Sequence, residues 1–444
     1  MFKKITSTLM LASMILLSSC QLNTEAEITN AQSTSLSQTT IGEDVLEKTD
    51  TKEISTDPTN TKTEMGEEPA TTTSGDSVTL EGNSADEEAD SPLADSELTL
   101  IASGDVLSHI TNTQAAKKAD GSYDFLPQMA EIEGLLSDGD YTLVNLESPI
   151  AGEKFGYRGF PKFNAPVNLG FTLKKLGVDL AITSNNHAMD NGFEGLKQNL
   201  DNLDRIGLEH TGTYRTQEEA DEVFVKEING IKIGFIATSY GTNNIPVPND
   251  FAVDLNSKKL IRKKIAQARE EGAEIIVHHI HWGREYTEYP SQYQMDYYGI
   301  MTEEGVDVIV GSHPHRLQPM EMRKITHEGR TKNQAVIWST GNMWQGQKKK
   351  RDFVNLGSVF RIEIERKDGV AQVKDLDYDL IYNLRWKVDG KEQYKVIPHS
   401  DMDLYKEQFP NTYDTMKKEF EWGEKTLNNT VDVIYSDGTR PKQP

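Results

Sequence analysis

The segment Asp307-Val308-Ile309-Val310-Gly311-Ser312-His313-Pro314-His315 joins a short run of β-branched residues directly to two histidines. A brief apolar run bounded by polar and glycine residues is typical of a buried strand. Proline favours an extended conformation at His313, and residues two apart in an extended chain point to the same side. The segment therefore predicts a strand over 307–310 whose carboxyl end presents both histidines together.

Similar short β-branched runs recur along the chain and alternate with longer helical patterns. This alternation is typical of a sheet that is largely parallel and covered by helices on both faces. Two later runs, 359–365 and 372–382, predict an antiparallel pair joined by the turn Lys367-Asp368-Gly369. The predicted fold class is therefore α/β. The other expected strands are 98–102, 141–145, 179–183, 231–237, 274–280 and 335–339, and the expected helices are 125–136, 169–176, 193–206, 257–271, 292–304 and 411–427.

Polar residues follow five of these strands at their carboxyl ends. In open α/β sheets, ligands bind beyond those ends, where the loops converge, so we expect the polar side chains to meet. Carboxylate oxygens and imidazole nitrogens suit divalent Zn, Mn or Fe better than Ca, and an asparagine carbonyl adds a neutral ligand. The sequence therefore predicts a metal site. Its candidate residues are Asp105, Glu147, Asn185, Asn186, His187, His281, His313 and His315.

Several of these residues also have a purely structural interpretation. Asp105 follows a glycine and fits a turn or helix cap, and Glu147 fits an ordinary surface loop. The pair His313 and His315 is the most specific element. Strand alternation places His281 on the same side as His279, but His278 and His279 lie deeper and are interpreted as core histidines. No role is assigned to His210, His327 or His399.

The first twenty residues have the pattern of a secretory signal. Lys3 and Lys4 precede an apolar core over 9–17 that is too short to span a bilayer, and the segment ends in Leu17-Ser18-Ser19-Cys20, which resembles a bacterial lipobox. We expect Cys20 to be lipidated and to anchor the protein on the extracytoplasmic face of the cell membrane. The alternative is a buried, inert thiol. Cys20 is the only cysteine in 444 residues, so an intramolecular disulfide and a thiolate-rich zinc site are both excluded.

Residues 21–97 have the composition of a disordered tether. They contain no aromatic residue and carry nineteen acidic residues against three lysines, so they cannot bury a core. They hold most of the net charge of −23, and neither they nor the mildly acidic remainder has the basic stripe that nucleic-acid binding requires. The expected organisation is a lipoprotein signal peptide over 1–20, this tether, one domain over 98–383, and a C-terminal extension over 384–444 packed on the domain.

Six motifs follow one another along the chain: Gly104-Asp105-Val106-Leu107, Asn145-Leu146-Glu147-Ser148-Pro149, Asn185-Asn186-His187-Ala188-Met189-Asp190-Asn191-Gly192, His281-Trp282-Gly283-Arg284-Glu285-Tyr286, Gly311-Ser312-His313-Pro314-His315 and Ser339-Thr340-Gly341-Asn342. In this order they resemble the capsule-synthesis CapA (PgsA) family of poly-γ-glutamate biosynthesis, within the calcineurin-like metallophosphoesterase superfamily. The resemblance covers residues 98–382. It implies a four-layer α/β/β/α sandwich whose strand-end loops hold a metal centre.

The resemblance also implies roles for residues in these motifs. Asp105 would be the bridging or central carboxylate, and His187, oriented by Asp190, would be the general acid or a donor to a phosphoryl or acyl oxygen. One or two divalent ions, Mn, Zn or Fe, would polarise the scissile group and activate a bound water. The other implied metal ligands are Glu147, Asn186, His281, His313 and His315.

Three positions depart from the superfamily pattern. The usual Asp-x-His start is absent because position 107 is leucine, and His109 lies two residues further on. Glu147 stands where a Gly-Asp motif is usual. Ala188 stands where an acidic residue usually follows the histidine, so Asp190 would substitute for it. These departures leave open a single metal ion, and a substrate other than a phosphoester.

The main functional interpretation is a surface lipoprotein in capsule or poly-γ-glutamate synthesis or export, with a hydrolase-like metal site. One alternative is a metal-dependent extracytoplasmic phosphoesterase or polymer hydrolase unconnected with capsule synthesis. Another is a non-catalytic factor that binds an anionic polymer for a membrane synthase complex. The histidine motifs argue against a transporter's substrate-binding lipoprotein.

An anionic polymer should meet basic side chains near the motifs. Arg284 and Arg316 are the candidates for such contacts. Lys154, Arg158 and Lys162 also lie near the motifs, but they are interpreted as solvated surface.

Overall fold

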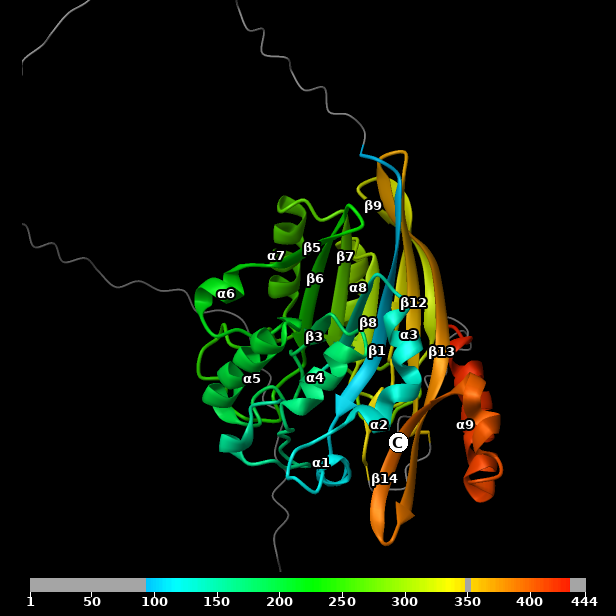
Figure 1. Cartoon of the computed structure of the whole chain (residues 1–444). Coiled ribbons are helices and arrows are strands. Elements are labelled where there is room, and N and C mark those ends of the chain that lie inside the picture. The colour runs from blue at the N-terminus through cyan, green and yellow to red at the C-terminus, as the bar shows by residue number, and fades with distance from the viewer. Residues whose placement is uncertain (1–92, 348–352, 432–444) are drawn as a thin grey trace, which may run out of the picture. The chain divides into compact units, whose positions relative to one another are not determined.

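The computed structural model describes residues 93–347 and 353–431 of the chain (Figure 1). The predicted signal peptide and the lipidation of Cys20 lie outside these residues, as does nearly all of the predicted tether. Within the described ranges, no helix combines the length and the apolar character needed to cross a bilayer. The folded domain begins with a strand at Ser96.

Two mixed β-sheets form the centre of the domain. The first has the strand order β14-β13-β12-β1-β2-β3-β4, with β11 beside β1, and the second has the order β5-β6-β7-β8-β10-β9. Strands β1 to β4 are parallel, as are β6, β7, β8 and β10, so their carboxyl ends lie at one edge of each sheet. The strands are β1 (Ser96–Leu107), β2 (Tyr141–Asn145), β3 (Leu180–Ile182), β4 (Glu209–Thr211), β5 (Phe224–Ile228), β6 (Ile231–Ser239), β7 (Ile275–His281), β8 (Val308–Ser312), β9 (Met320–His327), β10 (Arg330–Ile337), β11 (Trp344–Gln345), β12 (Leu356–Lys367), β13 (Val370–Val388) and β14 (Lys391–Pro398).

Three apolar layers join the two sheets and the helices outside them. On β1, Leu98 and Leu100 pack in the cluster between the sheets, whereas Ile101 packs with the helices outside the first sheet. On β7, Val277 packs between the sheets and Ile276 packs with the helices outside the second sheet. Successive residues of one strand thus alternate between two cores. The structure confirms the predicted four-layer α/β/β/α sandwich (Figure 1).

The helices follow from local sequence signals. In α5, Leu196, Leu200 and Leu203 are spaced four and three residues apart and are buried, so one face packs on the sheet. This helix ends at Ile206 and is capped by Gly207, whose φ of +74° is the left-handed conformation that favours glycine. The helix predicted over 125–136 is instead three short pieces. The helices are α1 (Ile110–Ala116), α2 (Leu126–Met129), η1 (Ala130–Ile132), α3 (Glu133–Ser137), η2 (Glu153–Phe155), α4 (Asn168–Lys175), α5 (Gly192–Ile206), α6 (Gln217–Asp221), α7 (Lys258–Glu270), α8 (Gln292–Glu303), η3 (His399–Tyr405) and α9 (Pro410–Leu427).

Strand β1 is longer than predicted and contains Asp105. It continues to Leu107, because β11 pairs with its last residues in parallel. Its register with β2 shifts between Ser103 and Asp105, which marks a β-bulge. At the bulge, a side chain on Gly104 would meet the carbonyl oxygen of Gly341 at 2.1 Å. Only glycine therefore fits between the bulge and the loop that follows β10.

The C-terminal part of the domain is continuous with the first sheet. The boundary expected at residue 383 lies inside β13, which pairs first with β12 and then with β14. Helix α9 follows and places Met416, Phe420 and Leu427 in the apolar cluster between the sheets. Residues 384–431 therefore complete the sheet edge and one end of the core.

His278 gives the domain a predictable pH dependence. Its ring is buried in β7, and Nε2 lies 3.0 Å from the Thr238 hydroxyl oxygen. Burial lowers the pKa of His278 from 6.5 to about 3, so the folded protein keeps the ring neutral while the unfolded chain gains a proton. The stability that His278 contributes is therefore complete above pH 6.5 and is lost as the pH falls below it.

We expect this loss to be smaller in the His278→Gln variant. Between about pH 7.5 and about pH 5.5, the free energy of unfolding of the native chain should fall by about 1.4 kcal/mol more than that of the variant. Urea denaturation at both pH values measures the difference, and the other histidines contribute equally to the two proteins. The same pH dependence in both would contradict a neutral, buried His278.

Candidate metal centre

Two groups of buried side chains that fit a metal ion meet beyond the ends of β1, β2, β7 and β8. The first group is Glu147, His281 and His313, and the second is Asp105, Glu147 and His315. Within each group the ligand atoms all lie within 4.8 Å of one another. Residues that are far apart in the sequence are thus brought together, as the strand-end pattern predicts, and Glu147 belongs to both groups.

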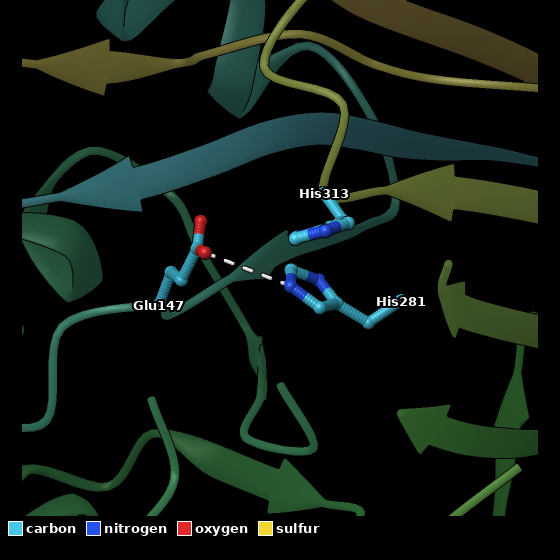
Figure 2. Close-up of side chains that lie close together, drawn as sticks. All are labelled: Glu147, His281 and His313. Atoms are coloured by element: carbon cyan, nitrogen blue, oxygen red, sulfur yellow. Dashed lines mark ion pairs between the residues drawn. The ribbon is translucent and has the colours of Figure 1, made fainter. Parts of the chain in front are cut away.

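The first group surrounds a space between three side chains (Figure 2). His281 Nε2 lies 3.6 Å from Glu147 Oε1, and the ring centroids of His281 and His313 are 4.8 Å apart. Asn186 Oδ1 lies 3.0 Å from His281 Nε2 and faces the same space. Asn186 Nδ2 donates a hydrogen bond to Asn243 Oδ1 at 3.2 Å, which orients the amide with its oxygen toward the group. Asn186 therefore offers this group a fourth donor atom.

The second group is arranged around His315. Its Nδ1 lies 2.9 Å from Asp105 Oδ2, and its Nε2 lies 3.8 Å from Glu147 Oε1. The same Glu147 oxygen approaches His281 in the first group. The resemblance assigns the bridging role to Asp105, but the structure places Glu147 between the two groups. The long side chain of glutamate accounts for this position, because it carries Oε1 to within 4 Å of a histidine on either side.

The buried carboxylate of Glu147 accepts no hydrogen bond from the described residues. Both of its oxygens are fully buried, and His313 Nδ1 also makes no hydrogen bond there, whereas Asp105 Oδ2 is paired with His315 Nδ1 at 2.9 Å. Burial of an ionised carboxylate without a partner is strongly unfavourable, so such groups are normally paired or bound to a metal. Carboxylate oxygen and imidazole nitrogen are donors that Zn, Mn and Fe ions accept. The residues present therefore fit a divalent metal ion.

The pKa values of these side chains follow from burial and from the charges close by. Burial and the Asp105 carboxylate raise the pKa of Glu147 well above its usual range. Burial lowers the pKa of His313 to about 3, and burial together with the His313 ring lowers that of His281 well below 6.5. Burial also opposes the charged form of His315, but the carboxylates of Glu147 and Asp105 outweigh it and raise its pKa to about 10. Because a bound cation favours ionised carboxylates and neutral imidazoles, metal and protons compete for these atoms.

The backbone of the segment from His313 to His315 differs from the prediction. Both histidines adopt the left-handed conformation, with φ of +97° at His313 and +56° at His315, so the extended segment predicted from Pro314 is wrong. The strand ends at Ser312, and the chain then turns so that the Pro314 carbonyl accepts a hydrogen bond from the Tyr286 amide at 2.7 Å. The two rings point into different ligand groups as a result. Such backbone strain in non-glycine residues is typical of functional sites.

His187 and Asp190, the predicted catalytic pair, are in contact. His187 Nδ1 lies 2.7 Å from Asp190 Oδ2, and both side chains are buried. The Phe163 amide donates to the same Asp190 oxygen at 2.5 Å, and the Phe163 ring packs edge-on against the His187 ring. Asp190 thus occupies the orienting position that the sequence predicts for it. The catalytic role of the pair stays a prediction.

Three polar residues that sequence analysis did not assign support the predicted ligands. Asn145 Nδ2 donates to Asp105 Oδ1 at 2.7 Å. Ser312 Oγ lies 2.7 Å from His281 Nδ1, and Asn342 Oδ1 lies 3.0 Å from His315 Nδ1. Such partners fix the orientation of ligand side chains. All three belong to the six motifs, and their positions there were the available signal.

The loop after β6 also reaches the site, and sequence analysis missed it. The Tyr240 ring lies 4.5 Å from the His313 ring between centroids, and its hydroxyl hydrogen-bonds with Asn186. Asn243, with a left-handed φ of +51°, orients Asn186. Both residues lie just beyond a predicted strand, which was the signal in the sequence that they could reach the site. Neither residue belongs to a motif.

The remaining histidines near the site lie outside both ligand groups. His278 contacts Thr238, as expected of a core histidine, whereas His279 is buried without a hydrogen bond to any described residue. His109 Nδ1 lies 3.3 Å from the Leu107 carbonyl oxygen, and its ring packs edge-on against Phe163. The structure therefore does not bring His109 into either group.

The arginines near the motifs have different surroundings. Arg316 pairs with Glu288, and its guanidinium lies 5.0 Å from the ring centroids of both Phe353 and Trp422. Arg158 donates to the Asp190 carbonyl oxygen at 3.0 Å and so braces the segment that carries the catalytic pair. Arg284 is exposed.

Comparison with known proteins supports the resemblance carried by the motifs. The family model described as "Bacterial capsule synthesis protein PGA_cap" matches residues 99–347, more than half of the chain. The PGA biosynthesis protein CapA of Bacillus subtilis (strain 168) is 26% identical over 330 residues, which cover 67% of this chain and 82% of that protein. The capsule biosynthesis protein CapA of Bacillus anthracis is 25% identical over 239 residues, which cover 51% of this chain and 57% of that protein.

Among solved structures, the calcineurin-like phosphoesterase YfkN from Bacillus subtilis aligns with 74% of this chain and 100% of its own, at 13% identity and a TM-score of 0.39. A likeness of that degree carries no information about function. The family match rests on the region that contains the six motifs up to Asn342. The chain belongs to the bacterial capsule synthesis protein family PGA_cap.

Proposed function

We propose that this chain acts in capsule or poly-γ-glutamate synthesis or export as a metal-dependent hydrolase. Its target would be a phosphoester, or an amide bond in an anionic polymer. The observation that supports this proposal is the pair of ligand groups that share Glu147, a buried carboxylate with no hydrogen bond to any described residue. A protein with only a structural role has no need to gather such groups at the ends of four strands.

The side chains would divide the chemistry as follows. Glu147, His281, His313 and Asn186 would hold one ion, and Asp105, Glu147 and His315 a second. Bound divalent ions polarise a scissile group and supply a nucleophilic water near neutral pH. With Nδ1 directed at Asp190, His187 has Nε2 free to donate a proton to the leaving group. Asp190 holds this ring in place.

A second candidate function is a non-catalytic factor that binds the polymer for a membrane synthase complex. The relatives are named for biosynthesis and not for hydrolysis, which favours this candidate. In that case the ligand groups would hold a structural ion or none. The two candidates therefore differ in whether metal and hydrolysis occur together.

Metal content and hydrolysis, measured on the same preparations, test the proposal. We expect the native chain to carry one or two transition-metal ions by elemental analysis and to cleave a chromogenic phosphodiester or poly-γ-glutamate. The double variant His313→Ala with His315→Ala removes one nitrogen from each group, so we expect it to lose metal and activity together. The substrate that is cleaved identifies the bond type.

A native chain without metal would contradict the catalytic proposal and favour the binding factor. Metal without hydrolysis of either substrate would leave a structural metal site. The matched control is His327→Ala, which alters a histidine on β9 outside both groups and should leave metal content unchanged.

We also propose that lipidation of Cys20 anchors the protein on the extracytoplasmic face of the membrane. The support is the signal-like segment that ends at this cysteine. In the Cys20→Ala variant, we expect radiolabelled fatty acid to be absent from the protein, because no other cysteine can take its place. Equal labelling of native and variant chains would overturn this assignment.

A further inference from the structure

A hollow of about 370 Å³ opens beside the first ligand group. Its walls come from the loop after β6, from the loop after β7 and from the start of α8. Tyr240 connects the hollow to the metal centre, because its ring packs against His313 and its hydroxyl contacts Asn186. The lining residues are Tyr240, Gly283, Arg284, Ser291, Gln292 and Tyr293.

Arg284 supplies the positive charge of this hollow. Its guanidinium is exposed and makes no hydrogen bond or ion pair with any described residue. Arg316 is held by Glu288, and Arg158 is held by backbone and side-chain oxygens around Asp190. Of these three arginines, Arg284 is therefore the one whose donors stay available to a ligand.

Two tyrosine rings flank the hollow. Tyr240 is 39% exposed and Tyr293 is 38% exposed, so each presents part of its ring to a molecule in the hollow. The Tyr293 hydroxyl accepts a hydrogen bond from Asn256 at 3.0 Å, which holds this ring in position. An exposed arginine alone is ordinary surface. An unpaired guanidinium that lines one hollow with two exposed rings, one of which touches the metal ligands, suits a chain with both anionic and carbon-rich parts.

We propose that this hollow is the subsite that binds a carboxylate group of the substrate chain. Arg284 would pair with the carboxylate, and Tyr240 and Tyr293 would flank the carbon backbone while the next bond of the chain reaches the metal centre. This proposal rests on the proposed function, because it assumes that the chain handled at the metal centre is a polycarboxylate. It adds a specificity-determining residue that lies in neither ligand group.

Glu285 limits where such a carboxylate can lie. It is exposed and directly follows Arg284 in the chain, so its negative charge would repel an anionic group close to it. A carboxylate of the substrate would therefore lie at Arg284. Substitution of Glu285, a neighbouring residue of opposite charge, provides the control for substitution of Arg284.

The test is binding of two fluorescent probes to the full chain, followed by anisotropy. One probe is a short oligo-γ-glutamate, and the other is the same oligomer with its carboxylates converted to amides. Arg284→Gln should raise the Kd of the acidic probe about tenfold, the usual effect of losing a charge-assisted hydrogen bond. Arg284→Lys should retain part of the affinity, Glu285→Gln should not weaken binding, and the amide probe should bind the native and Arg284→Gln chains alike.

Equal affinity of the native and Arg284→Gln chains for the acidic probe would overturn the subsite. Failure of the native chain to prefer the acidic probe would also overturn it. Metal content and phosphodiester hydrolysis, measured on the same preparations, report separately on the metal centre. If the subsite fails while metal and hydrolysis persist, the catalytic proposal stands; if the hydrolysis fails while Arg284 still governs binding, the hollow is a polymer site of the assembly factor.

Discussion

Replacing Glu147 with glutamine should weaken metal binding at both ligand groups by more than about 100-fold. Changes to residues that merely orient a ligand already lower metal affinity by about 10–100-fold, and Glu147 is itself a ligand candidate in both groups. Glutamine keeps the length of the side chain and removes its charge. Competition with a coloured chelator measures the affinity, and elemental analysis gives the number of ions that remain.

The same substitution should leave the metal-free protein at least as stable as the native chain. The Glu147 carboxylate is buried and accepts no hydrogen bond from the described residues, so its charge destabilises the folded state when no cation is bound. We therefore expect the Tm to stay level or rise without metal and to fall with it, relative to the native chain. Glu285→Gln, which removes an exposed charge close to the site, should change the Tm little, either without metal or with it. A lower Tm of Glu147→Gln in metal-free buffer would indicate a structural carboxylate instead.

Replacing His187 with asparagine should lower kcat by about 100- to 10,000-fold and leave the metal content unchanged. The ring lies outside both ligand groups, but it is buried and paired with Asp190 at 2.7 Å. Loss of the proton donor should slow substrates with a poor leaving group more than those with a good one. Kinetics with two chromogenic phosphodiesters that differ in leaving-group pKa measure this difference.

Asp190→Asn is the matched positioning variant for His187. It keeps the shape of the side chain but weakens its hold on His187 Nδ1, so kcat should fall less than in His187→Asn. A kcat in His187→Asn close to that of the native chain would exclude His187 as the proton donor. A loss of metal in this variant would instead place His187 among the ligands.

Much of the site was predictable, because the carboxyl ends of parallel strands meet at one edge of a sheet and bring the residues there together. Glu147, His281 and His313 follow or end strands whose apolar runs are plain in the sequence, and Asp105 lies near the carboxyl end of β1, so their meeting follows from the topology. The four layers were expected only from the resemblance carried by the motifs, because the strand and helix pattern by itself predicts helices on both faces of a sheet. The motifs then gave the family.

The remaining details depend on contacts that no local pattern encodes. The left-handed backbone of His313 depends on where β8 ends and on the Tyr286 amide, which comes from another loop. The position of Glu147 between the groups depends on the reach of its side chain in three dimensions. Tyr240 belongs to no motif. It follows β6, and His313 follows β8, which lies on the other side of β7, so the contact between the two rings depends on the order of the strands in the sheet.

The contact of Arg316 with Phe353 and Trp422 joins parts of the chain that are synthesised at different times. Arg316 directly follows His315, whereas Trp422 lies in α9, near the end of the described chain. During synthesis, the loop that carries the metal-binding histidines therefore emerges about a hundred residues before the helix that covers its arginine. A nascent or proteolysed chain that lacks α9 has all the ligand residues but not this brace.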